Sequence, residues 1–196
     1  MTPSRHLSRR RLLLGVGVVI GTSVAPAIGM AATPLPAARP PMPRAGIDGL
    51  PSMRLVHLHT HEKLDLMLVP ASAERPDLLA VVNRFLRDHY SGAQGRMDPG
   101  LLEQLRGLQA LLGGRTIEVI SGYRSPETNQ RLQERGGGGV ATRSLHLEGR
   151  ALDLRMPGVA LASLREAALE LRAGGVGFYP TSNFVHIDTG RVRRWG

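Results

Sequence analysis

The chain has 196 residues, of which 42% are hydrophobic, so it is long and apolar enough for one domain with a real core and is not a disordered chain. It contains no cysteine, which excludes disulfide bonds, a thiol nucleophile and thiolate metal ligands. The formal net charge is +9, but the basic residues are scattered without interleaved aromatic residues, and this pattern does not predict nucleic-acid binding.

Residues 1–27 predict an export signal. Four arginines and no acidic residue occupy the first eleven positions, an apolar run covers 12–24, and small residues follow, with cleavage expected after Ala27. The order Ser-Arg-Arg-Arg-Leu-Leu at 8–13 resembles a twin-arginine signal. An uncleaved membrane anchor is the alternative, for which the apolar run is short and rich in glycine. Cleavage would lower the formal charge from +9 to +5, which suits a polyanionic envelope or acidic peptides.

The rest of the chain predicts a linker and one domain. Residues 28–52 are expected to be the linker, because six prolines fall between 33 and 52 without apolar periodicity. The domain is expected to cover 53–196 and to be α+β, with a small, mostly antiparallel sheet. Alternation predicts strands, and 3.6-residue spacing or capping residues predict helices. The expected strands are 53–59, 63–69, 116–122, 151–156, 175–180 and 184–190, and the expected helices are 75–90, 99–112, 126–135 and 160–172.

Three polar residues are candidates for a metal site. Asp153 lies inside an apolar strand between Leu152 and Leu154, where a carboxylate is costly unless it is paired or binds a metal. His186 is flanked in the same way in its own strand, and His146 lies in the loop before the first of these strands. A His, Asp, His set suffices for a catalytic zinc ion, but each residue taken alone also fits an ordinary structural role. Spacing by itself leaves the two interpretations about even.

Three motifs resemble a known family. They are "SGYRSPETNQRL" at 121–132, "SLHLEGRALDL" at 144–154 and "GGVGFYPTSNFVHIDTGRVRRW" at 174–195. Together they resemble the zinc murein peptidases of the D-alanyl-D-alanine carboxypeptidase superfamily (LAS or hedgehog type), and among these the exported YcbK-like murein endopeptidases. The resemblance covers roughly residues 53–195 and implies that His146, Asp153 and His186 bind Zn²⁺ on the open face of a sheet whose helices pack on the other side. It also implies that Arg124 polarises the scissile carbonyl or holds a substrate carboxylate, whereas a structural ion pair is the alternative.

At the position of the general base, this sequence differs from the wider superfamily. Many members have an acidic residue three positions before the last histidine ligand, where this chain has Asn183, and others have a histidine where it has Phe184. Asp188 is the replacement we expect, either as base or as the hydrogen-bonding partner of a ligand histidine, because it shares a strand face with His186. Glu148 is the weaker candidate.

The resemblance implies an exported, zinc-dependent peptidase of the periplasm or cell envelope that hydrolyses amide bonds in peptidoglycan peptides, with cross-links as the favoured target. A D-alanyl carboxypeptidase and a catalytically weak cell-wall-binding module are the alternatives, and Asn183 keeps the second one open. No nucleic acid is expected as a partner, and the membrane is expected only through an uncleaved signal. His57, His59 and His61 alternate in "VHLHTH", which favours a structural role over a second metal site. Tyr123 and Tyr179 are candidates for the lining of the substrate cleft, and the alternative for Tyr179, which precedes Pro180, is that it packs a turn.

Overall fold

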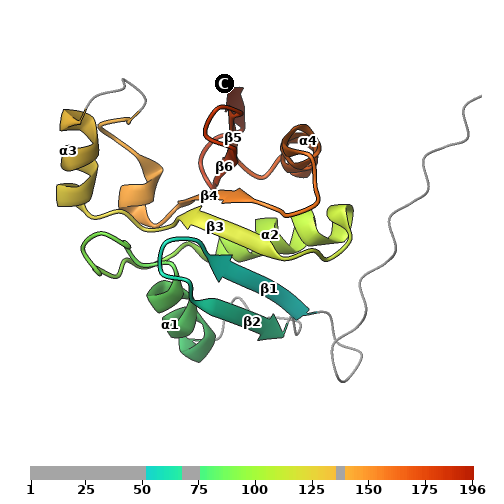
Figure 1. Cartoon of the computed structure of the whole chain (residues 1–196), viewed down its shortest axis with the longest axis horizontal. Coiled ribbons are helices and arrows are strands. Elements are labelled where there is room, and N and C mark those ends of the chain that lie inside the picture. The colour runs from blue at the N-terminus through green and yellow to red at the C-terminus, as the bar shows by residue number, and fades with distance from the viewer. Residues whose placement is uncertain (1–51, 68–75, 136–139) are drawn as a thin grey trace, which may run out of the picture. The chain divides into compact units, whose positions relative to one another are not determined.

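A computed structural model describes residues 52–67, 76–135 and 140–196, so the expected signal and nearly all of the linker lie outside the described residues. The described chain has the expected α+β architecture, with α-helices and a seven-stranded sheet (Figure 1). The strands are β1 (Ser52–His57), β2 (Lys63–Met67), β3 (Ile117–Ser121), β4 (Ala151–Arg155), β5 (Gly175–Tyr179), β6 (Phe184–Asp188) and β7 (Arg193–Trp195). The helices are α1 (Pro76–Phe85), α2 (Pro99–Leu112), α3 (Pro126–Glu134), the 3₁₀-helix η2 (Leu145–Glu148) and α4 (Leu161–Leu171).

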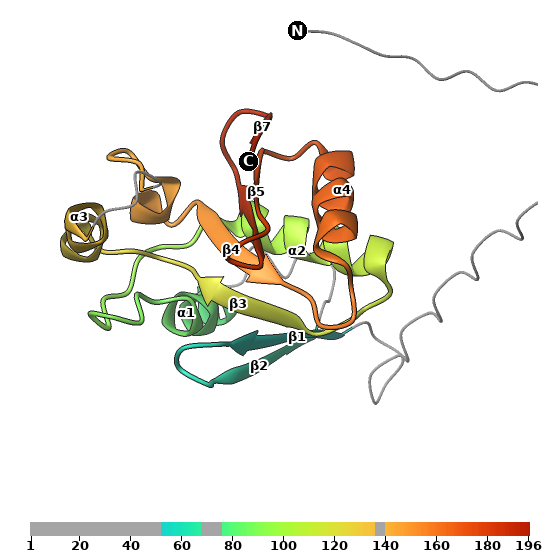
Figure 2. The same ribbon diagram turned by 45° about the horizontal axis from the view of Figure 1, so that its top comes forward.

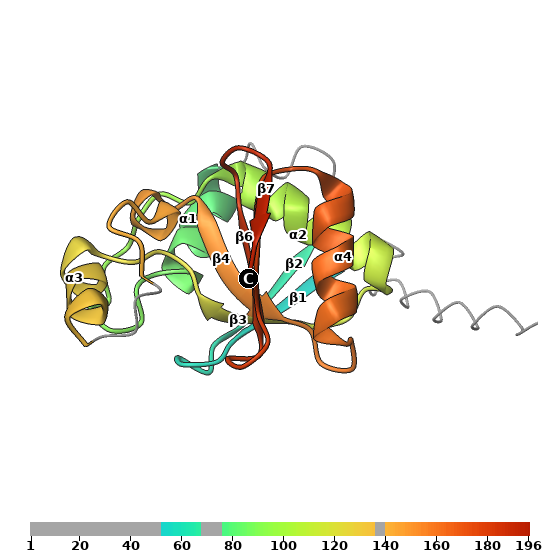
Figure 3. The ribbon, with the colours of Figure 1, turned by 90° about the horizontal axis from the view of Figure 1, so that it is seen from above.

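The sheet is mixed and has the strand order β2-β1-β3-β4-β6-β5-β7. The consecutive strands β1 and β2 form an antiparallel hairpin, and β3/β4, β4/β6 and β5/β6 are also antiparallel. The pairs β1/β3 and β5/β7 are parallel, which the sequence did not predict. In this order β4 and β6 lie next to each other near the middle of the sheet, and Figures 2 and 3 show α2 and α4 side by side. The two strands that carry candidate ligands are therefore direct neighbours.

Two helices, α2 and α3, begin at the residues expected from the sequence, and a capping side chain stabilises each start. The Asp98 carboxylate accepts from the backbone N–H of Gly100 at the start of α2, and the Ser125 hydroxyl accepts from that of Thr128 at the start of α3. The expected helix over 75–90 is shorter than predicted, because α1 ends at Phe85. The carboxylate of Asp88 there accepts from backbone N–H groups that follow it and turns the chain away from the helix.

The core lies on the face of β4 and β6 opposite the candidate ligands. Leu152, Leu154 and Val185 have no exposed surface, and Ile187 is nearly as buried. Strand alternation then turns the side chains between these residues to the other face. Within the described ranges, no helix is long and apolar enough to cross a bilayer.

His57 is a fully buried histidine at the end of β1, and its surroundings are those of a structural residue. Its ring packs edge-on against Phe85 and lies near the rings of His59 and His89. Its Nδ1 accepts from the backbone N–H of His59 at 3.3 Å, which leaves the buried Nε2 without a partner among the described residues. Burial, and then the neighbouring histidines, lower the pKa of His57 to about 4.

This buried histidine predicts acid sensitivity. The unfolded chain binds a proton at His57 below about pH 6.5 and the folded chain only below about pH 4, so stability is lost as the pH falls through this window. We expect the free energy of unfolding to fall by on the order of 3 kcal/mol as the pH is lowered through this window. Urea unfolding measured at several pH values tests this. The His57→Asn variant keeps an acceptor near Nδ1 but does not titrate, so its pH dependence should be shallower. An unchanged pH slope would show that His57 is not responsible.

Candidate metal centre

The structure brings His146, Asp153 and His186 together. Asp153 and His186 are direct partners in the β4/β6 register, and Asp153 Oδ1 lies 2.9 Å from His186 Nδ1. His146 Nε2 approaches from η2, 3.3 Å from Asp153 Oδ2 and 3.3 Å from His186 Nδ1. One donor atom from each residue lies within 4.8 Å of the others, and in the described part of the chain no other such group of His, Asp and Glu was found. The alternating histidines of 57–61 therefore do not form a second group of this kind.

Each histidine is held through its other ring nitrogen. His146 Nδ1 is 2.7 Å from the carbonyl oxygen of Gly122, so Nδ1 carries the proton and donates, and Nε2 presents a lone pair to the site. His186 Nε2 is 3.2 Å from Asp188 Oδ2, which leaves Nδ1 facing Asp153 and His146. An oxygen acceptor behind each imidazole is the usual arrangement of metal-binding histidines. The donor set and its outer partners fit Zn²⁺ chemically.

The loop that carries His146 depends on one glycine. Leu145–Glu148 form the short η2 helix, which ends at Gly149 with φ +68°. A Cβ at this position would lie 2.1 Å from the backbone oxygen of Arg96, so neither the conformation nor the contact suits another residue. Gly149 thus lets the chain turn from His146 into β4, where Asp153 follows.

The electrostatics of the site favour a charged carboxylate. Burial alone would raise the pKa of Asp153, but the imidazoles of His146 and His186 outweigh it and hold that pKa well below its usual value. Burial lowers the pKa of His186, but its hydrogen bonds to Asp153 and Asp188 outweigh this effect, so the pKa lies above its usual value. Asp153 is therefore an anion near neutral pH, as a metal ligand must be.

Asp188 lies behind His186 rather than in the open part of the site. Its carboxylate is fully buried and accepts from the backbone N–H groups of Gly175 at 3.0 Å and Gly190 at 2.8 Å. Arg193 donates to both of its oxygens, at 3.0 and 2.7 Å. Burial raises the pKa of Asp188, but these donors and His186 bring it well below its usual value.

Arg124 lies at the edge of the ligand set, just after β3. Its Nη2 is 4.0 Å from Asp153 Oδ2, and its Nη1 donates to the side-chain oxygen of Asn129 at 3.3 Å. Its side chain is only 14% exposed, and its backbone N–H donates to the carbonyl oxygen of His146. The guanidinium is thus held beside the ligands with hydrogen-bond donors to spare.

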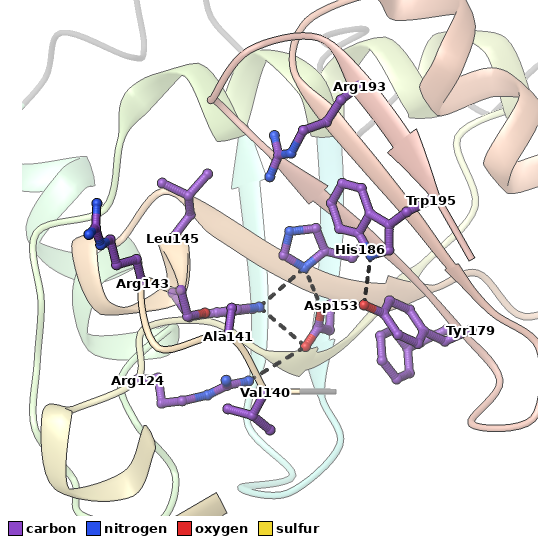
Figure 4. Close-up of a pocket in the computed structure, with 13 residues that line it drawn as sticks. Arg124, Val140, Ala141, Arg143, Leu145, Asp153, Tyr179, His186, Arg193 and Trp195 are labelled. Atoms are coloured by element: carbon purple, nitrogen blue, oxygen red, sulfur yellow. Dashed lines mark hydrogen bonds and ion pairs between the residues drawn. The ribbon is translucent and has the colours of Figure 1, made fainter. Parts of the chain in front are cut away.

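These residues border a cavity of about 360 Å³ (Figure 4). Its lining includes the three candidate ligands and Arg124, together with Val140, Ala141, Arg143, Ser144, Leu145, Tyr179, Phe184, Arg193 and Trp195. Neither Glu148, which is exposed and paired with Arg150, nor the exposed Asn183 belongs to it. Asp153 is therefore the only carboxylate among the described lining residues.

The sequence did not predict the part that the last strand plays. Residues 193–195 were not among the expected strands, but they form β7, which pairs in parallel with β5, and both Arg193 and Trp195 line the cavity. The isolated Trp195 and the run of arginines near it were the available signals. A strand of three residues gives no periodicity from which its position could be inferred.

A buried His, Asp, His set with an arginine beside it, opening on a cavity in an α+β domain, is typical of a metal-dependent hydrolase. The chain belongs to the family described as "Peptidoglycan L,D-endopeptidase MepK" (Peptidase_M15_2), which matches residues 48–195. It is similar to the peptidoglycan L,D-endopeptidase MepK of Escherichia coli K12, with 41% identity over 189 residues that cover 96% of this chain and 97% of that protein. The probable peptidoglycan L,D-endopeptidase MepK of Haemophilus influenzae is 37% identical over 191 residues, covering 95% of this chain and 94% of that protein.

These similarities extend over nearly the whole chain, and they confirm the resemblance to the YcbK-like branch of this superfamily. The chain is therefore a peptidase.

Proposed function

We propose that this chain is a zinc-dependent murein endopeptidase that hydrolyses an amide bond in peptidoglycan cross-links. The relatives in Escherichia coli and Haemophilus influenzae are both described as L,D-endopeptidases of peptidoglycan, and nothing favours the D-alanyl carboxypeptidase or the cell-wall-binding module over this function. The observation that carries the proposal is the convergence of His146 Nε2, Asp153 and His186 Nδ1, with Arg124 within 4.0 Å of Asp153. Action on peptidoglycan implies the periplasm or cell envelope, and the twin-arginine-like segment is the proposed route of export.

His146, Asp153 and His186 would hold the zinc ion, which when bound supplies a Lewis acid and lowers the pKa of a coordinated water. Arg124 is the residue that we propose to bind the scissile carbonyl oxygen, because its guanidinium lines the same cavity and keeps its charge at any working pH. Negative charge that develops on this oxygen is then stabilised by a donor that is already in place.

We propose the orienting role for Asp188, the second of the two roles that the sequence suggested. Its carboxylate is fully buried and already accepts from Arg193 and two backbone N–H groups, so it is poorly placed to take a proton from a water in the cavity. Its contact with His186 Nε2 fixes the tautomer that presents Nδ1 to the site.

The Asp188→Asn variant is expected to bind zinc about 10- to 100-fold more weakly, because the amide is a poorer acceptor for the His186 N–H. Competition with a chromophoric chelator measures this affinity. With zinc in excess, a large part of the activity should return. If zinc affinity is unchanged while turnover is lost, Asp188 is the base and the orienting role is wrong. Because Asp188 is buried, the melting temperature of the variant should be recorded alongside.

The function is tested by incubating the purified, zinc-loaded protein with cross-linked muropeptides and resolving the products by mass. We expect the dimeric peptides to be split into two monomers by addition of one water. Loss of a single terminal D-alanine instead would indicate the carboxypeptidase. Binding without any cleavage would indicate the cell-wall-binding module.

A further inference from the structure

Three aromatic side chains form one wall of the cavity, on the side of β5, β6 and β7. This aromatic wall consists of Tyr179 at the end of β5, Phe184 at the start of β6 and Trp195 in β7, and all three line the cavity. Tyr179 and Phe184 stack with ring centroids 4.6 Å apart, and the Trp195 ring lies 5.3 Å from that of His186. The wall therefore adjoins the ligand set directly.

One hydrogen bond within the wall has a fixed direction. Trp195 Nε1 lies 2.8 Å from the Tyr179 hydroxyl oxygen, and because an indole N–H can only donate, the tyrosine oxygen accepts (Figure 4). The tyrosine O–H must then be donated elsewhere. Within the part of the chain that the structure describes, the Tyr179 hydroxyl has no other hydrogen-bond partner. Its proton is thus free for a group that enters the cavity.

Two further features hold Trp195 in this position. Gly177 pairs with both His186 and Trp195, and a Cβ on it would lie 2.8 Å from the indole nitrogen, so the absence of a side chain lets the indole lie against β5. The guanidinium carbon of Arg193 is 4.7 Å from the Trp195 ring, and the same guanidinium binds Asp188. The indole is therefore anchored to the group that orients His186.

The strand order puts Tyr179 opposite Arg124. Arg124 follows β3 and Tyr179 ends β5, and β4 and β6, which carry Asp153 and His186, lie between these strands. Hydrogen-bond donors therefore flank the ligand set on both sides.

We propose that the Tyr179 hydroxyl binds an oxygen of the substrate peptide and that Trp195 is the positioning residue for this hydroxyl. This inference rests on the proposed peptidase function and names a substrate-binding group for it.

The Tyr179→Phe variant removes only the hydroxyl and keeps the stacking on Phe184. Because the lost hydrogen bond is made to the substrate both before and during reaction, we expect KM for a dimeric muropeptide to rise about tenfold while kcat changes by less than about twofold. The zinc content should match that of the wild type. The Tyr90→Phe variant is the matched control, since Tyr90 is half-exposed and does not line the cavity. A fall in kcat with unchanged KM, or a loss of zinc, would overturn the proposal.

Trp195→Phe removes the N–H but retains an aromatic ring beside His186. If the indole acts through Tyr179, this substitution should raise KM in the wild type by several-fold but change it little in the Tyr179→Phe background. Equal effects in both backgrounds would show that Trp195 does not act through the hydroxyl.

A binding measurement separates this inference from the function itself. Trp195 is the sole tryptophan of the chain, so its fluorescence reports on the cavity without any cleavage. Titration with a monomeric muropeptide should change the emission of the wild type, and Tyr179→Phe should bind about tenfold more weakly. Equal affinities would overturn the role of Tyr179 even if the enzyme is active. A wild type that binds through Tyr179 but cleaves nothing would instead contradict the peptidase function.

Discussion

Replacing His146 with alanine is expected to abolish both zinc binding at the site and peptidase activity. The side chain supplies one of three donor atoms that lie within 4.8 Å of one another, and its Nε2 has no substitute nearby in the described chain. Loss of a catalytic metal removes several kcal/mol of transition-state stabilisation, so kcat/KM should fall by at least about a thousandfold. Metal analysis of the purified protein and cleavage of dimeric muropeptides measure the two effects.

Glu148→Gln is the matched control for this substitution. Glu148 lies two residues away on the same 3₁₀-helix, but its side chain is exposed and outside the cavity. We expect the control to keep its zinc and to stay within about twofold of wild-type activity, because its salt bridge to Arg150 is exposed. Activity that survives His146→Ala would rule out the proposed site, and activity that is lost in Glu148→Gln would reopen the search for the base.

Replacing Arg124 with alanine is expected to lower kcat/KM by about 100- to 1,000-fold, the usual cost of losing one donor to a developing oxyanion. Zinc should remain bound, because Arg124 lies beside Asp153 and is not a candidate ligand. Steady-state kinetics together with metal analysis distinguish this result from that of His146→Ala. The Arg124→Lys variant should recover part of the loss, since it keeps the charge but not the planar fork.

Arg131→Ala is the control for Arg124→Ala. Arg131 is an exposed residue of α3, the helix that follows Arg124, and its side chain does not border the cavity. No change in activity is expected. If Arg124→Ala keeps its activity but loses stability, Arg124 is a structural residue that pairs with Asp153. A structural ion pair is the alternative role that the sequence left open for Arg124.

Local patterns predicted the larger elements well and the last strand poorly. Asp98 and Ser125 marked helix starts because capping depends on a few consecutive residues. The end of α1 was misplaced by several residues, since apolar spacing continues past Phe85 while the Asp88 carboxylate turns the chain. The parallel pairing of β5 with β7 joins strands that are not consecutive, and nothing local encodes it.

The sequence by itself determined which side-chain types are available to a metal site, the family and the faces of two strands. A period of two sends Asp153 and His186 away from their apolar neighbours whatever surrounds them, and the absence of cysteine restricts a metal site to His, Asp and Glu.

Only the tertiary structure decided what each nitrogen and oxygen of the site faces. The carbonyl oxygen of Gly122 behind His146, the burial of Asp188 beneath Arg193 and the indole of Trp195 against Tyr179 all join segments that are distant along the chain or on different strands. Hydrogen-bond direction and burial depend on such contacts, and the spacing of residues in the sequence does not predict them.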